Sequence, residues 1–203
     1  AQAIAQPSES ESAFELASGR VRAAVASRVT RDEAHSLSDE QIAALHSGSP
    51  QGLTPVGRAT HNEIKTYLKN VVTHLRGAHQ WPDELAHVLV IGPGENIEEV
   101  QAVLEELPGI QTLHIVDPFR SVLNTMERDL PIYLADHAEL TAHVTLYRST
   151  VLQLPDPLAG TVQVVVINRV LSGAFFYLEK LQQAYQEIAR ALAPNGVLLL
   201  GEQ

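Results

Sequence analysis

Four consecutive apolar residues, Val88–Ile91, are followed at once by a Gly-Pro-Gly turn at residues 92–94. A mostly β-branched run of this kind is typical of a strand that is buried on both faces of a parallel sheet. Downstream, residues 97–107 place apolar side chains at helical spacing, with Glu98 and Glu99 among the residues on the other faces. The segment therefore predicts a strand, a tight glycine turn and a helix, in that order.

The glycine turn has two interpretations. In a strand–turn–helix unit, the backbone amides at the helix start face the open end of the sheet, where a ligand can approach glycine without meeting a Cβ atom. A Gly-x-Gly sequence also occurs in turns that only connect a strand to a helix. The turn alone leaves the two interpretations at about even odds, and Asn96 is placed to cap the helix in either case.

The composition restricts the class of protein. The chain has 203 residues, is 45% hydrophobic and carries a formal net charge of −10, with a sequence pI near 5.3. This length fits one domain with an added segment, and the acidic balance argues against a broad nucleic-acid or membrane-surface role. Cysteine is absent, which excludes disulfides and thiolate chemistry. No apolar run approaches the ~18 residues of a membrane span. Residues 1–11 do not resemble an intact signal peptide, and we expect a cytoplasmic protein.

Residues 1–57 are predicted to form an N-terminal helical cap with a flexible start. A partial apolar stripe predicts a helix over Ala13–Val29, and Ser38 followed by Gln41 is the signature of a capping box that opens a second helix ending near His46. Glycine and proline are frequent in residues 47–57, so we place the boundary there and assign residues 58–203 to the core domain.

Strands alternate with helices along the core domain, which predicts an α/β fold with a doubly wound, mostly parallel sheet and right-handed crossovers. About five strands are expected, at residues 88–91, 112–116, 143–147, 162–167 and 197–200. Helices are expected at residues 59–76, 97–107 and 177–192, after Pro118, and again from Pro131, which we place at a helix start. Tyr67 and Trp81, in the segment before the first core strand, are candidate lid residues, although core packing fits both better.

Asp117 stands at the end of the second core strand. In a parallel sheet, an acid at this position lies beside the glycine turn of the preceding strand and can accept hydrogen bonds from a ribose diol. The other interpretation is a cap of the following helix, a role that aspartate fills well. With the glycine turn taken into account, ribose binding leads by roughly two to one.

From Val88 onward, the chain resembles the class I S-adenosylmethionine-dependent methyltransferases. The resemblance is carried by the glycine turn, by Asp117 with Pro118 and Phe119, by the segment 150–155, and by the strand 164–171 with its following helix and Pro-Asn-Gly turn. It implies S-adenosylmethionine as cofactor. The cofactor contacts that it implies are Gly92, Pro93, Gly94, Glu95, Asn96, Asp117, Pro118, Phe119, Thr150, Val151, Asn168 and Val170.

The cofactor motifs depart from the family pattern at three positions. Val90 replaces the acid that often ends the first strand, Asn96 replaces the third glycine, and Thr150 replaces the acid expected near the adenine. Each change removes a polar contact with the cofactor. The chain also stops after the fifth predicted strand, where the family adds an antiparallel hairpin. Either the core is cut short, or another chain or the N-terminal helices cover the sheet edge.

No catalytic residue is named by the resemblance, because methyl transfer from a sulfonium depends mainly on alignment. Asn168 and Arg169 are weak candidates at the tip of the fourth strand: the first to orient an acceptor, the second to hold a carboxylate or phosphate. The segment lacks the Asn/Asp-Pro-Pro-Tyr/Phe run of enzymes that methylate amino groups of nucleic acids. The nine histidines show no metal-ligand spacing, so no metal is expected.

The sequence supports three functions, in order of preference. The first is methyl transfer from S-adenosylmethionine to a small-molecule acceptor. The second is an inactive, methyltransferase-like binding or scaffold subunit, favoured by the changes at Val90, Asn96 and Thr150. The third is an NAD-dependent oxidoreductase. Against this function, Ile97 stands where the dinucleotide-binding motif has its third glycine. A homodimer or partner subunit would contact the N-terminal helices or the open sheet edge; neither nucleic acid nor a membrane is expected as partner.

Overall fold

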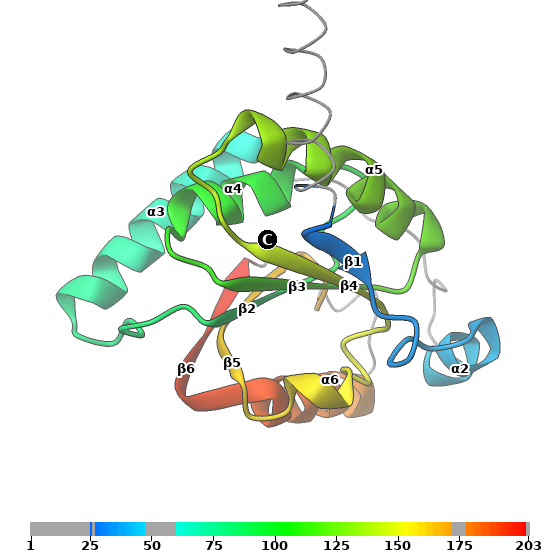
Figure 1. Cartoon of the computed structure of the whole chain (residues 1–203). Helices are drawn as coiled ribbons and strands as arrows, with labels where there is room; N and C mark the ends of the chain where they lie inside the picture. The colour runs from blue at the N-terminus through cyan, green and yellow to red at the C-terminus, as the bar shows by residue number, and fades with distance from the viewer. Residues whose placement is uncertain (1–24, 26, 48–59, 172–177, 202–203) are drawn as a thin grey trace, which may run out of the picture.

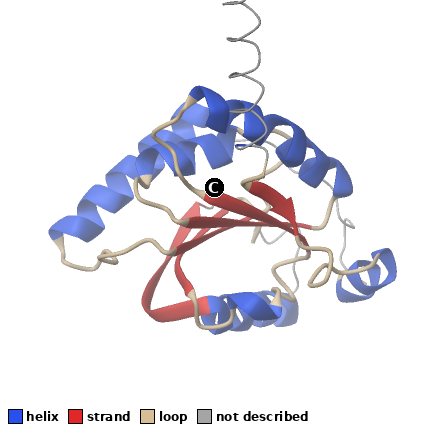
Figure 2. Cartoon of the chain, in the orientation of Figure 1, coloured by secondary structure: helices blue, strands red, loops and turns tan. Residues whose placement is uncertain are grey.

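A six-stranded, all-parallel sheet forms the centre of the molecule, in the order β1-β4-β3-β2-β5-β6 (Figures 1 and 2). The computed structural model describes residues 25, 27–47, 60–171 and 178–201. The strands are β1 (Val29–Arg31), β2 (His87–Ile91), β3 (Thr112–Asp117), β4 (His143–Arg148), β5 (Val162–Asn168) and β6 (Leu192–Gly201). The helices are α2 (Asp39–Leu45), α3 (His61–Gly77), α4 (Glu98–Glu106), α5 (Arg120–Asp136), α6 (Leu178–Ala191) and the short 3₁₀ turn η1 (Asp156–Leu158). The predicted α/β class and parallel sheet are confirmed.

Helices cover both faces of the sheet (Figure 2). Successive side chains of β2 point to opposite faces: Val88 and Val90 join the core formed with α3, α4 and α5, whereas Leu89 and Ile91 join the core formed with α6. All four side chains are at most 1% exposed. Burial on both faces explains why β2 reads as an unbroken apolar run rather than an alternating one.

The direction of winding reverses at β2. From β2 the chain passes through α4 to β3 and through α5 to β4, always toward one edge of the sheet, while β5, α6 and β6 build the other half. Strands β3 and β5 therefore flank β2 on its two sides, and the connecting helices change faces at the same point (Figure 1). In open α/β sheets, ligands bind in the crevice at the carboxyl ends of the two strands where the order reverses. Here those strands are β2 and β5.

Two helix starts are closed by capping boxes. The predicted pair of Ser38 and Gln41 caps α2, and α2 ends at its cap residue His46 as expected. Thr60 and Glu63 form the same reciprocal arrangement at α3, where the Thr60 amide donates to Glu63 Oε2 at 2.8 Å. These bonds satisfy amide groups that the first helical turn leaves without an intrahelical acceptor.

Strand β1 was not predicted. It lies where the sequence indicated the end of the helix Ala13–Val29, and Val29 instead begins a strand that pairs in parallel with β4. The remainder of that predicted helix, apart from the helical residue Val25, falls almost wholly outside the described residues. Residues 29–31 form a strand because β4 offers a free parallel edge, and Val29 packs into the core on the α3–α5 side. The segment is too short for its own pattern to reveal this.

Two further predictions need correction. Pro131 does not start a helix but lies inside the continuous helix α5. The apolar stripe of Val122, Met126, Leu130 and Leu134 is buried on both sides of the proline, and this burial outweighs a proline penalty of about 3 kcal/mol.

The last strand is also longer than predicted. β6 starts directly after α6, and the Pro-Asn-Gly turn bulges out of it at residues 193–196 between two paired stretches. Asn195, at φ +64°, supplies the left-handed residue that this bulge requires.

No helix among the described residues is long and apolar enough to cross a membrane.

Replacing Thr60 by alanine should lower the free energy of unfolding by about 1 kcal/mol, because the Glu63 amide loses its acceptor in the capping box. Thr66 is exposed inside the same helix and serves as the matched control. Thr66→Ala should be neutral or stabilising by a few tenths of a kcal/mol, roughly the difference in helix propensity. Urea denaturation of both variants measures the two effects; equal changes would exclude a stabilising role of the cap.

Candidate functional site

The turn at the sheet reversal has a backbone conformation that only glycine adopts easily. Ile91 pairs with Val116 of β3 and Ile167 of β5, so the residues after these strands meet at one edge. Gly92 has φ +66° and Gly94 has φ +85°. Side chains at such angles are strained, and this explains why the turn after β2 contains two glycines.

Gly92 is also required by packing. A Cβ atom at Gly92 would lie 2.6 Å from Cγ2 of Val170, which comes just after β5. A Cβ at Gly94 would meet no atom of the described residues within 4 Å. The predicted residues Gly92 and Val170 are therefore in direct contact, whereas there is room for a side chain at Gly94.

Asp117 lies beside the glycine turn, as its position at the end of β3 predicts. The Gly92 amide donates to the Val116 carbonyl at 2.9 Å, which ties the turn to β3. The Asp117 carboxyl is only 3% exposed, and its Oδ1 accepts a hydrogen bond from the Phe119 amide at 2.8 Å. Burial raises the pKa of Asp117 to about 7, although the bond from Phe119 opposes this shift. Through one of its two oxygens, Asp117 thus shapes the turn before α5, but it does not cap the helix, because the cap residue is Phe119 and no side chain bonds to the first helical turn.

The start of α4 is unusual for a helix that comes after a glycine turn. Asn96 Oδ1 accepts from the Glu98 amide at 3.2 Å, so one free amide of the first turn is already satisfied by the chain itself. Pro93 has no amide hydrogen, and the Gly92 amide is engaged with β3. The acids Glu98 and Glu99 occupy the first helical turn. The Gly92 and Glu98 amides are therefore already engaged within the chain, and two acidic residues stand in the first helical turn.

Glu99 is a site residue that the sequence analysis missed. The helical pattern assigned it to an outer face, but its side chain is 4% exposed. It contacts the tip of β5, where the Asn168 side chain hydrogen-bonds to its carboxyl and the charge of Arg169 acts on it. Burial nevertheless raises the pKa of Glu99 to about 8. Its spacing could have indicated this burial. Glu99 stands three and four residues before Ala102 and Val103, and residues at this spacing share one face of a helix.

The tip of β5 is held in a defined conformation. Arg169 has φ +60°, a left-handed angle uncommon for a residue with a side chain, and its amide donates to the Gly201 carbonyl at 2.7 Å. A Cβ at Gly201 would lie 2.6 Å from Asn168 Oδ1, so Gly201 leaves the room that the Asn168 side chain occupies. Strands β5 and β6 together place Asn168 and Arg169 next to Glu99.

The remaining cofactor contacts predicted from the sequence differ in their exposure. Glu95 is exposed, while Thr150 and Val151 are buried after the end of β4. Thr150 Oγ1 accepts from the Leu152 amide at 2.9 Å, so its hydroxyl shapes the local turn. Val90, in the position of the acid usual in the family, is fully buried in the core.

Arg148 connects the site region to α2. Its guanidinium forms an ion pair with Asp39 in the first turn of α2 and donates to the carbonyls of Pro118 and Leu37. Pro118 and Phe119 thus belong to a loop that contacts both the buried Arg148 and the Asp117 carboxyl.

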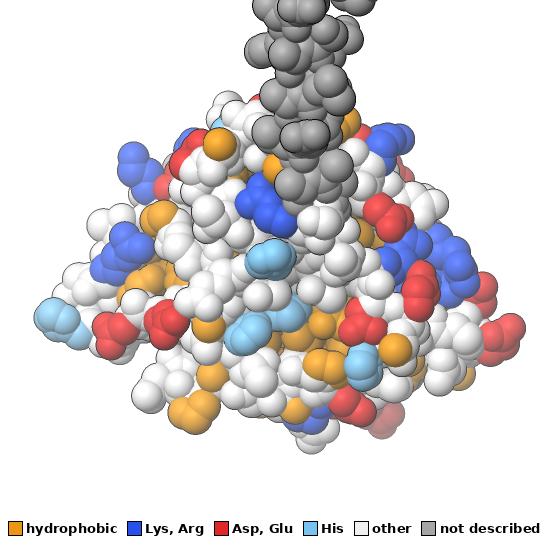
Figure 3. Space-filling model, in the orientation of Figure 1, with side chains coloured by type: hydrophobic (Ala, Val, Ile, Leu, Met, Phe, Trp, Pro, Cys, Tyr) orange, Lys and Arg blue, Asp and Glu red, His pale blue; other side chains and the backbone are white. Residues whose placement is uncertain are grey.

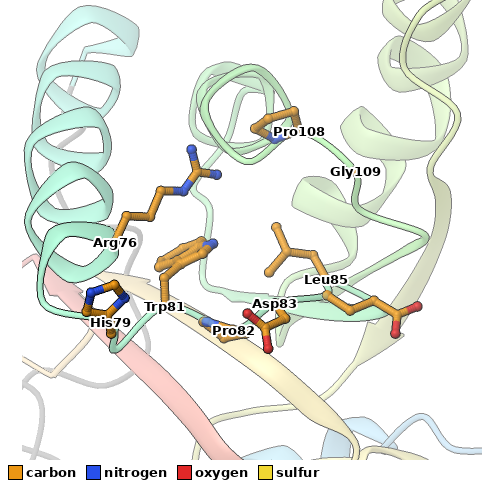
Figure 4. A pocket seen from close by; sticks show the side chains of 9 residues that line it. Arg76, His79, Trp81, Pro82, Asp83, Leu85, Pro108 and Gly109 are labelled. Atoms are coloured by element: carbon orange, nitrogen blue, oxygen red, sulfur yellow. The ribbon is translucent and has the colours of Figure 1, made fainter.

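A separate hollow lies at the other end of the sheet (Figure 4). It measures about 480 Å³ and is lined by residues 81–85 together with Arg76, His79, Pro108 and Gly109. The Arg76 guanidinium carbon lies 5.8 Å from the centre of the Trp81 ring. Trp81 precedes β2, so it stands at the amino ends of the strands, far from the glycine turn, and the structure does not support its role as a lid. Tyr67 packs partly buried against the core.

Histidines do not form a metal site among the residues that the structure describes, since no group of three or more His, Asp or Glu side chains is suitably placed. Figure 3 shows histidine side chains near the middle of one face, with basic and acidic side chains interspersed around them. His87 Nδ1 lies 3.0 Å from His114 Nε2, and burial lowers the pKa of His114 to about 4. The His114 ring is therefore neutral near pH 7, and it contacts His87 in this neutral form.

These features define a Rossmann-like, doubly wound α/β protein with a glycine turn at its reversal point. No protein-family model and no curated protein matches the chain in sequence. Similar solved structures include a protein from Methanococcus maripaludis that is provisionally assigned as an S-adenosyl-L-methionine-dependent methyltransferase (16% identity, TM-score 0.45), with 74% of this chain and 67% of that chain covered.

Two other similar structures are longer proteins. One is the CurJ carbon methyltransferase (16% identity, TM-score 0.48), with 67% of this chain and 34% of that chain covered. The other is PKMT2 from Rickettsia typhi (18% identity, TM-score 0.44), with 70% and 26% covered. The chain thus spans about a third or less of these two proteins. At this level of identity, the likeness concerns the fold.

We expect Gly92→Ala to lower the free energy of unfolding by about 2–4 kcal/mol, since it adds a contact with Val170 to the strain of a positive φ. Gly94→Ala carries the strain alone and should cost about 1 kcal/mol. In the double variant Gly92→Ala/Val170→Ala, the contact disappears and part of the loss should be recovered. Additive effects of the two substitutions, measured by chemical denaturation, would contradict the contact.

The buried carboxyl of Asp117 should make the protein less stable at high pH. Its pKa is about 7 in the folded chain and near 3.8 in the unfolded chain, so the folded state binds the proton more tightly. Stability is then lost as the pH rises from about 4 to 7. Relative to Asp117→Asn, the wild type should lose on the order of 2–3 kcal/mol between pH 4.5 and pH 8. Denaturation curves at both pH values test this, with the exposed Asp136→Asn as control; parallel behaviour of wild type and Asp117→Asn would refute it.

Proposed function

We propose that this chain binds S-adenosylmethionine in the crevice between β2 and β5 and transfers its methyl group to a small-molecule acceptor. The proposal is supported first by position. The carboxyl ends of the two strands at the reversal carry an open glycine turn, and a buried acid stands on the adjacent strand β3. This combination suits an adenosine moiety, whose ribose hydroxyls donate to a carboxylate while its sugar approaches a glycine backbone.

The observation that carries the proposal is the charge and hydrogen-bonding state of the α4 start. A dinucleotide needs free amide groups there for its pyrophosphate. In this chain, Pro93 has no amide hydrogen, the Gly92 and Glu98 amides are engaged, and Glu99 is buried in the first helical turn with its Oε1 unpaired among the described residues. An anion beside Glu99 would favour its protonated form, whereas a sulfonium or an ammonium group would favour its ionised form and be attracted to it. The same adenosine-binding geometry therefore favours S-adenosylmethionine over NAD.

The bound cofactor supplies an electrophilic methyl group, and the chain's residues provide binding and orientation. Asp117 Oδ1 is held by the Phe119 amide, which fixes the carboxyl so that it can receive the ribose hydroxyls. Asn168 and Arg169 stand at the tip of β5, beside the crevice, and are suited to orient the acceptor through hydrogen bonds and charge. Since transfer of a methyl group from a sulfonium is governed by alignment, such positioning is the main catalytic contribution expected of them.

Calorimetric titration of the chain with S-adenosylmethionine and S-adenosylhomocysteine tests the proposal. We expect micromolar binding of S-adenosylmethionine, a loss of affinity of at least about 10-fold in Asp117→Ala, and no binding of NAD. Asp136→Ala, which removes an exposed acid at the end of α5, should bind like the wild type. Absence of binding of both sulfur compounds up to about 1 mM would overturn the proposal.

The single tryptophan reports where the ligand binds. Trp81 lines the hollow at the amino ends of the strands, opposite the crevice. Saturation with S-adenosylmethionine should therefore leave its emission spectrum unchanged while the calorimetric signal develops. Quenching or a spectral shift that tracks the same binding curve would place the ligand in the hollow and contradict the assigned site.

A further inference from the structure

We propose that Glu99 is the buried counter-charge for a cationic group of the cofactor and makes the crevice selective for a positively charged ligand. This inference rests on the proposed function and deepens it, since it names the residue that reads the charge of the bound molecule. No other acid of α4 is placed as Glu99 is: it is the buried one, and its side chain reaches the tip of β5.

Glu99 stands in the first turn of α4, directly after the glycine turn, and is 4% exposed. Its Oε1 accepts no hydrogen bond from any residue that the structure describes. Buried carboxyl oxygens are rarely left in this state, because an unsatisfied acceptor retains the full cost of leaving water. A ligand group that donates to Oε1 would remove this cost.

The surroundings of Glu99 differ from those of the other acids of α4. Asn168 and Arg169 face it from the tip of β5, and Arg169 also acts on Glu63 at the start of α3. The other acids of α4 already have partners on the neighbouring helices. Glu98 accepts from the His61 amide at 3.1 Å, Lys65 contacts both Glu105 and Glu106, and the Tyr133 hydroxyl donates to Glu105. Glu99 is thus the acid of this helix with capacity for a further cation.

Because burial raises the pKa of Glu99 to about 8, the carboxyl holds a proton in most molecules near pH 7. A cation bound beside it favours the ionised form, so the proton leaves to the buffer as the ligand binds. Binding of a positively charged ligand should therefore release protons and should strengthen as the pH rises toward 8. A neutral group at the same place would produce neither effect.

S-adenosylmethionine carries two cationic groups, the sulfonium and the α-ammonium, whereas S-adenosylhomocysteine carries only the α-ammonium. The two ligands therefore identify which group meets Glu99. Titrations of the wild type, Glu99→Gln and Glu98→Gln with both compounds, each in phosphate and in Tris buffer, give affinity and the number of protons released. Glutamine keeps the shape of a protonated glutamate, and Glu98→Gln removes a charge one residue away in the same turn.

For a sulfonium partner, we expect Glu99→Gln to bind S-adenosylmethionine about 10- to 100-fold more weakly, to bind S-adenosylhomocysteine unchanged, and to lose the proton release. For an α-ammonium partner, both ligands weaken equally in Glu99→Gln. Either result supports the proposal if Glu98→Gln changes the affinity for neither ligand by more than about 3-fold. A change of that size is expected when an exposed charge is removed. Equal affinity and equal proton release in wild type and Glu99→Gln would overturn it while leaving the proposed function intact.

A pH series keeps the test valid if Glu99→Gln does not fold. The pKa of Asp117 is about 7, so this carboxyl also titrates in the relevant range, and the series is therefore run on Asp117→Asn as well as on the wild type. In both proteins, the affinity for S-adenosylmethionine should rise between pH 6 and pH 8, because Glu99 is present in both. A flat profile in Asp117→Asn would overturn the role of Glu99. Failure of both sulfur compounds to bind the wild type would overturn the proposed function, and this inference with it.

Discussion

Parallel pairing is the constraint on which this structure depends. Each strand must lead into a crossover on one face of the sheet, and the crossovers change faces only where the strand order reverses. That reversal, at β2, brings the ends of β2 and β5 side by side at one edge of the sheet. The apolar character of β2, the two glycines after it and the packing of Gly92 against Val170 all result from its place at the centre.

The start of α4 determines the chemistry beside the glycine turn. A helix start normally attracts anions, since its dipole and its free amides both point outward. Here the Asn96 side chain occupies one amide, and Glu99 is buried in the first turn. Adenosine-containing ligands differ mainly in the group attached to the ribose, which is either a set of phosphates or a cationic amino-acid chain. Under the proposed function, the buried Glu99 favours the cationic chain.

The central elements could be predicted from sequence, because their patterns reflect burial that the fold imposes on every residue. β2 and β5 show it as apolar runs, and the position of Asp117 beside the turn results from parallel pairing alone. The missed features depend on distant partners. Val29 is in a strand only because β4 lies beside it, and Pro131 is tolerated only because a continuous stripe packs on both sides. The charge of Glu99 suggests a solvent-exposed side chain, and only the tip of β5 shows why it is buried.

The edge strand β1 has a consequence for the order of assembly. Its three residues pair with residues of β4 that lie more than 100 positions further along the chain. The ribosome releases β1 early, but β1 can pair only with β4. This partner strand is in place only after β2, β3 and β4 have been synthesised and have paired into a sheet. β1 must therefore dock late, after the slow closure of long-range contacts. Until then its intended neighbour, β4, presents an open hydrogen-bonding edge, and a second nascent chain could occupy it first.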